Sequence, residues 1–213
     1  VGSCSHSDIS TFSFHPLKSI TTGEGGAITT NSEVIAKKIR LFRAHGFEEN
    51  MKNRWDYKSN NFGLNYRLSD INAALGYSQI KKLKTFVKKR KNIYMHYLNH
   101  LDNYENVINI VKREKNTSPS YHLVIARVNF RRLNINKVEF LKKLEKKKIL
   151  CQFHYIPCYN FGKYNCKINK KLKNSELYER DVFSLPIHYE INRYELSYII
   201  KTIKQIINLC MKK

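Results

Sequence analysis

The stretch from Ser13 to Gly26, SFHPLKSITTGEGG, constrains the possible fold more than any other part of the sequence. The residues that lead into it, Ile9 to His15, alternate apolar and polar side chains and are rich in aromatic and β-branched types, which predicts a strand. Pro16 ends that strand, because proline has no N–H to donate to a neighbouring strand. A pair of glycines then permits close backbone approach before a second predicted strand at residues 27–30.

One isolated lysine, Lys18, lies in this loop among hydroxyl-bearing residues and glycines, whereas many of the other lysines occur in runs. Ser13 and Lys18 flank the predicted turn, so their side chains could point into the same space. An amine held in a pocket rather than in water is a nucleophile that can form a Schiff base. The alternative is a surface lysine in a loop, which is the commoner case for a lysine taken at random. The loop alone leaves both interpretations open.

Two helical regions follow in the first half of the chain. Apolar spacing predicts a helix of about three turns that begins after Asn31 or Ser32 and closes at Gly46. Residues 48–58 are polar and aperiodic, which predicts a surface loop, and an irregular link follows at residues 61–67. A long helical region starts near Ser69, and we expect a break in it near Leu83.

The second half of the chain alternates predicted strands and helices, which is typical of a small α/β domain. The strands are expected at residues 107–111, 122–128 and 149–154, and a short helix at residues 175–181. Two capping-box patterns, Asn136 with Glu139 and Asn192 with Glu195, predict the starts of two further helices.

Composition excludes several classes of protein. Among 213 residues, 42% are hydrophobic, which fits a globular fold, and no apolar run is long enough to cross a bilayer. The net charge of +22 resides mainly in lysine runs such as Lys146 to Lys148, which resemble solvated helix faces rather than a nucleic-acid motif. Five cysteines without a CxxC pair indicate reduced thiols in the cytoplasm.

Other catalytic patterns are missing from the sequence. It contains no G-x-S-x-G nucleophile motif and no HExxH or HxH pair, so neither a serine triad nor a metal site is expected. The run GEGG at residues 23–26 is too short for a dinucleotide fingerprint and lacks the Lys-Ser/Thr pair of a phosphate-binding P-loop. Lys18 and its surroundings remain the best candidate for chemistry.

Several runs together resemble one known family. They are SFHPLKSITTGEGGAITTN (13–31), RLFRAHGF (40–47), GLNYRLSDINAALGYSQIKKL (63–83), SYHL (120–123) and QFHYIPCY (152–159). In this order, and over nearly the whole chain, they resemble the DegT/DnrJ/EryC1/StrS family of sugar-nucleotide aminotransferases. These are pyridoxal 5'-phosphate (PLP) enzymes of the α/β, aspartate aminotransferase-like fold type I.

The resemblance implies an architecture and an activity. Residues 1–103 would form the C-terminal part of the large PLP-binding domain, and residues 104–213 the small C-terminal α/β domain. The intact enzyme would be a cytoplasmic homodimer with shared active sites, binding neither nucleic acid nor membrane. It would move an amino group, expected to come from glutamate, to a 4-keto-6-deoxy UDP-sugar.

The resemblance also implies site residues. Lys18 would be the Schiff-base lysine and would also move a proton. Ser13 would bind the cofactor phosphate, and Asn65 would reach the phosphate in the neighbouring subunit. The segment with Gln152, His154 and Tyr155 would line the nucleotide-sugar pocket.

Three further residues have weaker support. His122 would join the sugar pocket, but an interior strand histidine is an equal alternative. The resemblance also places Arg43 and His45 in the site, and an equal alternative is that they only order a loop.

The sequence departs from the family pattern in what precedes the lysine segment. Family members carry a large half-domain before the lysine segment, with the aspartate that pairs with the cofactor ring nitrogen. We therefore expect an N-terminally truncated chain that is inactive or barely active alone. Two rival hypotheses are a non-catalytic remnant of the family and a basic nucleic-acid-binding protein.

Overall fold

The computed structural model describes residues 1–49, 55, 57–59, 61–162 and 172–212. The chain forms two compact units, residues 1–84 and 85–213. The predicted domain boundary at residue 103 concerns the domains of a complete enzyme, and it stays a prediction. In the described part of the chain, none of the helices combines the length and apolar character that a membrane span requires.

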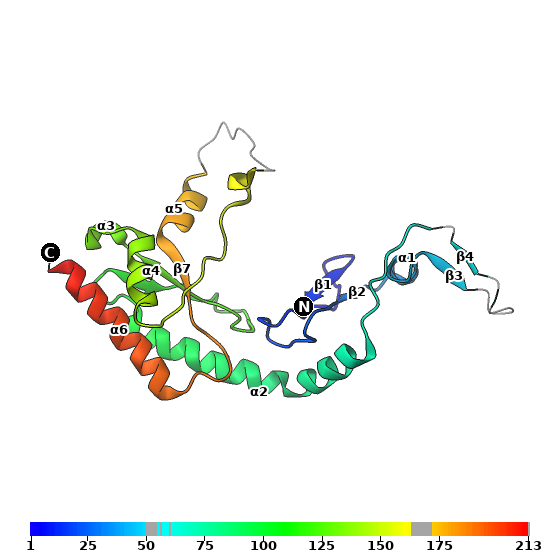
Figure 1. Cartoon of the computed structure of the whole chain (residues 1–213), viewed down its shortest axis with the longest axis horizontal. Helices are drawn as coiled ribbons and strands as arrows, with labels where there is room; N and C mark the ends of the chain where they lie inside the picture. Colours follow the sequence, from blue (N-terminus) through cyan, green and yellow to red (C-terminus); the bar gives the residue numbers. More distant parts are fainter. Residues whose placement is uncertain (50–54, 56, 60, 163–171, 213) are drawn as a thin grey trace. The chain divides into compact units, whose positions relative to one another are not determined.

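Unit 1 begins with a β-hairpin (Figure 1). Strands β1 (Ser10–Ser13) and β2 (Gly26–Thr29) pair antiparallel, with Ser13 opposite Gly26. Both strands were predicted from the sequence, each to within about two residues at either end. The hairpin therefore carries the whole Ser13–Gly26 loop between its two strands.

Helix α1 (Glu33–Arg43) follows the hairpin and is capped as predicted. The Ser32 side chain accepts a hydrogen bond from the backbone N–H of Ile35. At the other end the Gly46 N–H donates to the carbonyl of Leu41 (2.8 Å), and His45 takes the left-handed conformation with φ of 63°. These contacts satisfy helix-end groups that otherwise lack intrahelical partners.

Two predictions for the first half of the chain are wrong. The ends of the expected loop at residues 48–58 pair as short antiparallel strands, β3 (Phe47–Glu49) and β4 (Tyr57–Ser59), because backbone pairing needs no apolar periodicity. The remainder of that loop lies outside the described residues, apart from Trp55. Helix α2 (Asp70–Leu101) has no break at Leu83, since the lysines around this position are good helix formers and no proline interrupts them.

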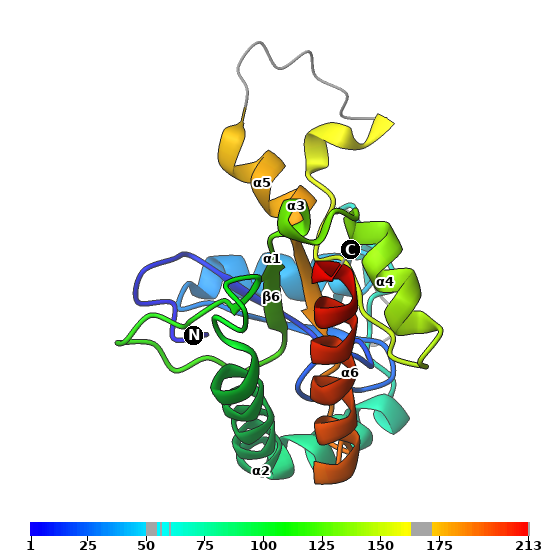
Figure 2. The same ribbon diagram turned by 90° about the vertical axis from the view of Figure 1, so that its left-hand side faces the viewer.

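Unit 2 is built around a three-stranded antiparallel sheet in the order β5–β6–β7 (Figure 2). The strands are β5 (Ile108–Ile110), β6 (Val124–Val128) and β7 (Val182–Leu185). The helices besides the second half of α2 are α3 (Phe130–Leu133), α4 (Lys137–Glu145), α5 (Lys173–Asp181) and α6 (Arg193–Met211), with a 3-10 turn η1 (Cys158–Asn160).

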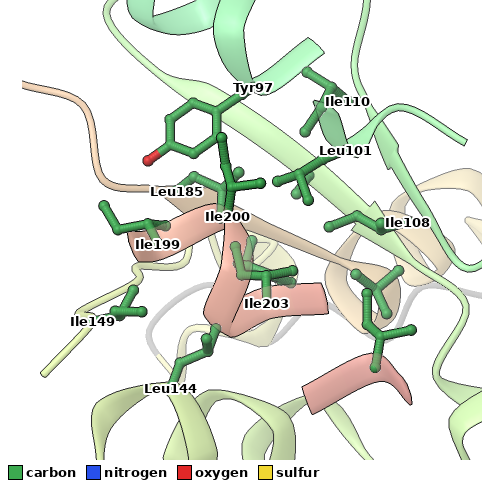
Figure 3. Close-up of a cluster of buried hydrophobic side chains, with 14 of the residues drawn as sticks. Tyr97, Leu101, Ile108, Ile110, Leu144, Ile149, Leu185, Ile199, Ile200 and Ile203 are labelled. Carbon is green, nitrogen blue, oxygen red and sulfur yellow. The ribbon is translucent and has the colours of Figure 1, made fainter. Parts of the chain in front are cut away.

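The hydrophobic core of unit 2 lies between one face of this sheet and the helices (Figure 3). Along β6, Val124, Ala126 and Val128 are fully buried, whereas Arg127 between them is exposed. The helical side of the core includes Tyr97 and Leu101 of α2, Leu144 of α4, and Ile200 and Ile203 of α6. The sheet therefore has a core face and a second, more polar face.

Both predicted capping boxes are confirmed. Asn136 and Asn192 each accept from the backbone N–H three residues later, and the glutamate there accepts from the cap's own N–H. The expected strand at residues 149–154 is wrong, because only Gln152 pairs, through an isolated bridge to Ser184. Strand β7, with which it pairs, was not predicted.

Candidate functional site

A tight turn precedes Lys18 within the Ser13–Gly26 loop. The backbone N–H of Lys18 donates to the carbonyl of His15 (2.9 Å), which closes a four-residue turn with Pro16 in its second position. The ring Nδ1 of His15 also accepts from the N–H of Leu17 (3.2 Å). Proline presets the backbone angle and the histidine ring closes the turn a second time, so the position of the Lys18 backbone is well defined.

The rest of the loop is held by threonines. The carbonyl of Phe14 accepts from the Thr21 hydroxyl (2.9 Å) and from the Thr22 N–H (3.1 Å). Thr22 is buried, and its hydroxyl donates to the carbonyl of Glu24 (2.8 Å). The same carbonyl accepts from the Asn72 side chain of α2 (3.3 Å). The loop is therefore fastened both to itself and to the first turn of α2.

The glycines of the loop are required by close packing. A Cβ on Gly25 would lie 2.5 Å from the Thr22 hydroxyl oxygen, and a Cβ on Gly26 would lie 2.6 Å from the Phe12 carbonyl oxygen. Gly76 of α2 is similarly close to Thr22, because a Cβ there would lie 2.7 Å from the threonine methyl. Side chains at these positions would push the loop away from both the strand and the helix.

The predicted cofactor residues lie in unit 1. Lys18 is half-buried, and Ser13 is exposed at the end of β1, where its hydroxyl lies 3.4 Å from the His15 backbone nitrogen. An amine, a hydroxyl and a glycine-rich backbone within one ordered loop suit a phosphorylated aldehyde, because the amine can react with the carbonyl and the hydroxyl can bind the phosphate. The residues present therefore fit PLP.

Asn65 lies in a segment that pairs with the end of α1. It forms an isolated antiparallel bridge with Ala44, flanked by hydrogen bonds from His45 N–H to the Leu64 carbonyl and from Tyr66 N–H to the Arg43 carbonyl. The backbones of Gly46 and Gly63 touch, because a Cβ on Gly63 would lie 2.1 Å from the Gly46 nitrogen. Asn65 is exposed on this fixed backbone, and Arg43 is exposed as well.

The predicted sugar-binding segment lies in unit 2, beside β7 (Figure 1). Gln152 and Ser184 exchange two backbone hydrogen bonds, of 3.2 and 2.8 Å. His154 is half-buried and Tyr155 exposed, and their rings meet edge to face with centroids 4.8 Å apart. The three predicted residues therefore lie on one stretch of chain that is paired to β7 at Gln152.

A cavity of about 220 Å³ opens next to this segment. Its lining includes Lys137, Phe153, His154, Tyr155 and Tyr178. The Lys137 ammonium lies 4.1 Å from the centroid of the Phe153 ring and donates to the carbonyls of Glu179 and Val182. Burial lowers the pKa of Lys137, and the nearby Glu179 and Asp181 carboxylates oppose that shift.

His122 lies before β6 and is half-buried in unit 2. The buried Arg90 of α2 donates to its carbonyl (3.3 Å) and also to the carbonyl of Ile187 (3.2 Å), which follows β7. Burial lowers the pKa of Arg90. One guanidinium thus ties the chain before β6 to the chain after β7 and fixes the backbone at His122.

Sequence reasoning missed the residues that position these side chains. Thr22 looks like its neighbours in TTGEGG, and only the approach of α2 sets it apart. Ser184 lies in VFSL, whose apolar residues before Pro186 signal a short strand but give no sign of its partner. Arg90 lies within a lysine-rich run that reads as a solvated helix face.

Comparison with known proteins identifies the family of this chain. Residues 1–204 match the model of the DegT/DnrJ/EryC1/StrS aminotransferase family. The UDP-4-amino-4,6-dideoxy-N-acetyl-beta-L-altrosamine transaminase of Campylobacter jejuni is 34% identical over 211 residues, which are 98% of this chain and 54% of that protein. The chain thus spans about half the length of the curated relatives it matches.

Solved structures agree with this match. Helicobacter pylori PseC, an aminotransferase involved in the biosynthesis of pseudoaminic acid, superposes with a TM-score of 0.88 at 30% identity, over 95% of this chain and 54% of that one. The PMP-form of a putative sugar aminotransferase from Streptococcus pneumoniae gives 0.84 at 25% identity, over 98% of this chain and 55% of that one, and a PLP-form is also known. The predicted fold type I of PLP-dependent sugar aminotransferases is confirmed. The chain therefore belongs to the DegT/DnrJ/EryC1/StrS aminotransferase family.

Proposed function

We propose that the protein takes part in PLP-dependent transfer of an amino group to a keto-sugar nucleotide. The observation that carries the proposal is Lys18, a half-buried lysine fixed by a closed turn in a loop whose sequence resembles the family's cofactor segment. The alternative of a random surface lysine does not account for the double closure of the turn or for the buried threonine in the same loop.

The residues of unit 1 would bind the cofactor. The Nζ of Lys18 would hold PLP through its aldehyde carbon, and the Ser13 hydroxyl would donate to its phosphate. Bound PLP supplies an electron sink that acidifies a C–H bond next to the substrate nitrogen. The Nζ of Lys18, once released, would take that proton and return it to a different carbon. Asn65, exposed on a rigid backbone, would contact the phosphate of the cofactor held in the neighbouring subunit of a homodimer.

The residues of unit 2 would bind the sugar nucleotide. Gln152, His154 and Tyr155 present an amide, an imidazole and a phenol along one stretch, and these groups can donate to and accept from sugar hydroxyls and phosphate oxygens. His122 would be a further contact. From the names of the relatives, we propose a UDP-linked 4-keto-6-deoxy sugar as the acceptor, in an amino-sugar pathway such as pseudaminic acid synthesis. Glutamate is the amino donor that the family resemblance implies.

The proposed location is the cytoplasm. Cys4, Cys151, Cys158 and Cys210 are free thiols, and Cys166 lies outside the described residues. Free thiols fit a reducing compartment.

Borohydride trapping tests the proposed role of Lys18. Reduction of the protein with PLP should leave a stable pyridoxyl adduct on the peptide that contains Lys18, detectable by peptide mass spectrometry. Lys18→Ala should lose this adduct, whereas Lys38→Ala, which removes an exposed lysine on α1, should keep it. Labelling spread evenly over the exposed lysines, unchanged by Lys18→Ala, would contradict the proposal.

A further inference from the structure

Ser184 is a buried polar residue in a strand that otherwise serves the core. It lies in β7 between Phe183 and Leu185, whose side chains are 0% and 2% exposed and belong to the hydrophobic cluster. Successive side chains of a strand point to opposite faces, so Ser184 points to the more polar face of the sheet. It is nevertheless only 5% exposed.

The hydroxyl of Ser184 lies against the imidazole of His154. Its Oγ is 2.8 Å from the His154 Nδ1, a distance typical of a strong neutral hydrogen bond. The backbone of Ser184 is fixed on both sides, because it pairs with Ile125 in β6 on one edge of β7 and with Gln152 on the other. The serine therefore meets the histidine from a rigid element and cannot move away without breaking sheet pairing.

The backbone of His154 is held separately. The Tyr178 hydroxyl of α5 donates to the His154 carbonyl (2.9 Å). This contact fixes where the residue lies, but it does not restrain rotation of the imidazole ring. The hydrogen bond to Ser184 instead acts on a ring nitrogen of His154, and the edge-to-face contact with Tyr155 acts on the ring itself.

We propose that Ser184 is a positioning residue that fixes the ring orientation of His154 for binding the sugar nucleotide. The inference rests on the proposed function, in which His154 lines the sugar pocket. Ser184 itself need not touch the substrate. By holding Nδ1, it also fixes the direction in which the other ring nitrogen points, and through the edge-to-face contact it orders Tyr155 as well.

Kinetics and NMR of four variants test this role, with the kinetics measured in the intact enzyme because this chain alone is expected to be inactive or barely active. Ser184→Ala should raise KM for the keto-sugar nucleotide about three- to tenfold, as expected for one lost hydrogen bond, and change kcat much less. Ser184→Thr keeps a hydroxyl in a strand that favours β-branched residues, so it should restore KM to within about twofold. His154→Ala should raise KM at least as much as Ser184→Ala, and Ser197→Ala, an exposed serine on α6, is the matched control.

The NMR readout does not depend on turnover. The ring nitrogen resonances of His154, in protein labelled with ¹⁵N-histidine, should shift in Ser184→Ala and return in Ser184→Thr. Unshifted resonances in Ser184→Ala, or an unchanged KM, would overturn the inference. A Lys18 adduct that fails to form contradicts the proposed function instead, so the two failures are distinguishable.

Discussion

At the scale of single residues, two of the free thiols differ in the chemistry of their surroundings. The Cys4 thiol is half-buried beside β2, and its Sγ lies 3.2 Å from the Thr29 carbonyl oxygen and 3.5 Å from the Thr29 hydroxyl. The hydrogen bond to the Thr29 side chain lowers the pKa of Cys4. Burial in unit 2 instead raises the pKa of Cys151 to about 12. Because the thiolate is the nucleophile, the two residues should react at very different rates.

Alkylation at pH 8 checks this difference. Iodoacetamide should modify Cys4 well before Cys151, as followed by peptide mass spectrometry over time. Cys158, which is exposed, is an internal control for access. Modification of Cys151 as fast as Cys158 in the folded protein would contradict the burial of this thiol.

The raised pKa of Cys151 also makes stability depend on pH. Its folded-state pKa lies above the ordinary thiol value, so the unfolded chain loses this proton first as pH rises. The contribution of the neutral thiol is therefore present below the ordinary thiol pKa and declines as pH rises from there towards 12. Cys151→Ala should flatten this part of the plot of unfolding free energy against pH, measured in a reducing buffer.

At the scale of elements, the starts of helices α4 and α6 rest on a few local hydrogen bonds. In α6, Asn192 accepts from the Glu195 N–H (2.9 Å), and Glu195 accepts from the Asn192 N–H (2.9 Å). Asn192→Ala removes the side-chain half of this capping box. We expect a loss of about 1 kcal/mol in the free energy of unfolding, measured by urea denaturation.

A substitution elsewhere on the same helix provides the control. Gln205 is exposed in α6, and Gln205→Ala should change stability by only a few tenths of a kcal/mol, because alanine is an even better helix former. Equal effects of the two substitutions would show that the cap contributes little beyond helix propensity.

The elements that could be predicted from the sequence are those specified by near neighbours. Asn136 and Asn192 each predict a helix start because a glutamate follows three residues later. In the hairpin, apolar and polar side chains alternate on the first strand, and Pro16 and the glycines mark the ends of the strands. Strand β7 could not be predicted in the same way, because its place depends on β6, more than fifty residues earlier in the chain. A short apolar run such as VFSL gives no sign of which partner it will meet.

The same division holds for the candidate site. Lys18 was singled out because it is isolated in its own loop, a property that the sequence displays directly. The residues that support the site could not be found in that way, since Thr22 depends on the approach of Gly76 and Ser184 on a bridge to Gln152. A local motif can point to a candidate reactive side chain, but tertiary contacts decide which residues hold it in place.

At the scale of the whole chain, the two units differ sharply in their cores. Unit 2 encloses the hydrophobic cluster of Figure 3. Among the described residues of unit 1, no apolar side chain is buried, and large ones such as Leu17, Phe62 and Ile71 are 70%, 77% and 83% exposed. A cavity of about 990 Å³ opens in unit 1, lined partly by Phe12, Ile39 and Leu68.

This difference predicts how the 213-residue chain should open when it is studied alone. Backbone amides in β6 are protected by the core of unit 2, whereas those of β1 and β2 belong to a two-stranded hairpin with no buried apolar support. A two-stranded hairpin is marginal in water, so it should open locally at little cost in free energy. Hydrogen exchange should therefore be more than about a hundredfold slower in β6 than in β1, corresponding to a difference of roughly 3 kcal/mol in opening free energy.

Mass spectrometry of peptides from the two units provides the measurement, and α1 provides a second test within unit 1. Helix α1 has no buried residue, so the exchange rates of its amides should be close to those of β1 and much faster than those of β6. If an added partner covers unit 1, the protection of unit 1 should rise while that of β6 changes little, because β6 is already protected by the core of unit 2. Equal protection of β1 and β6 in the isolated chain would mean that the buried core of unit 2 does not govern where this chain opens.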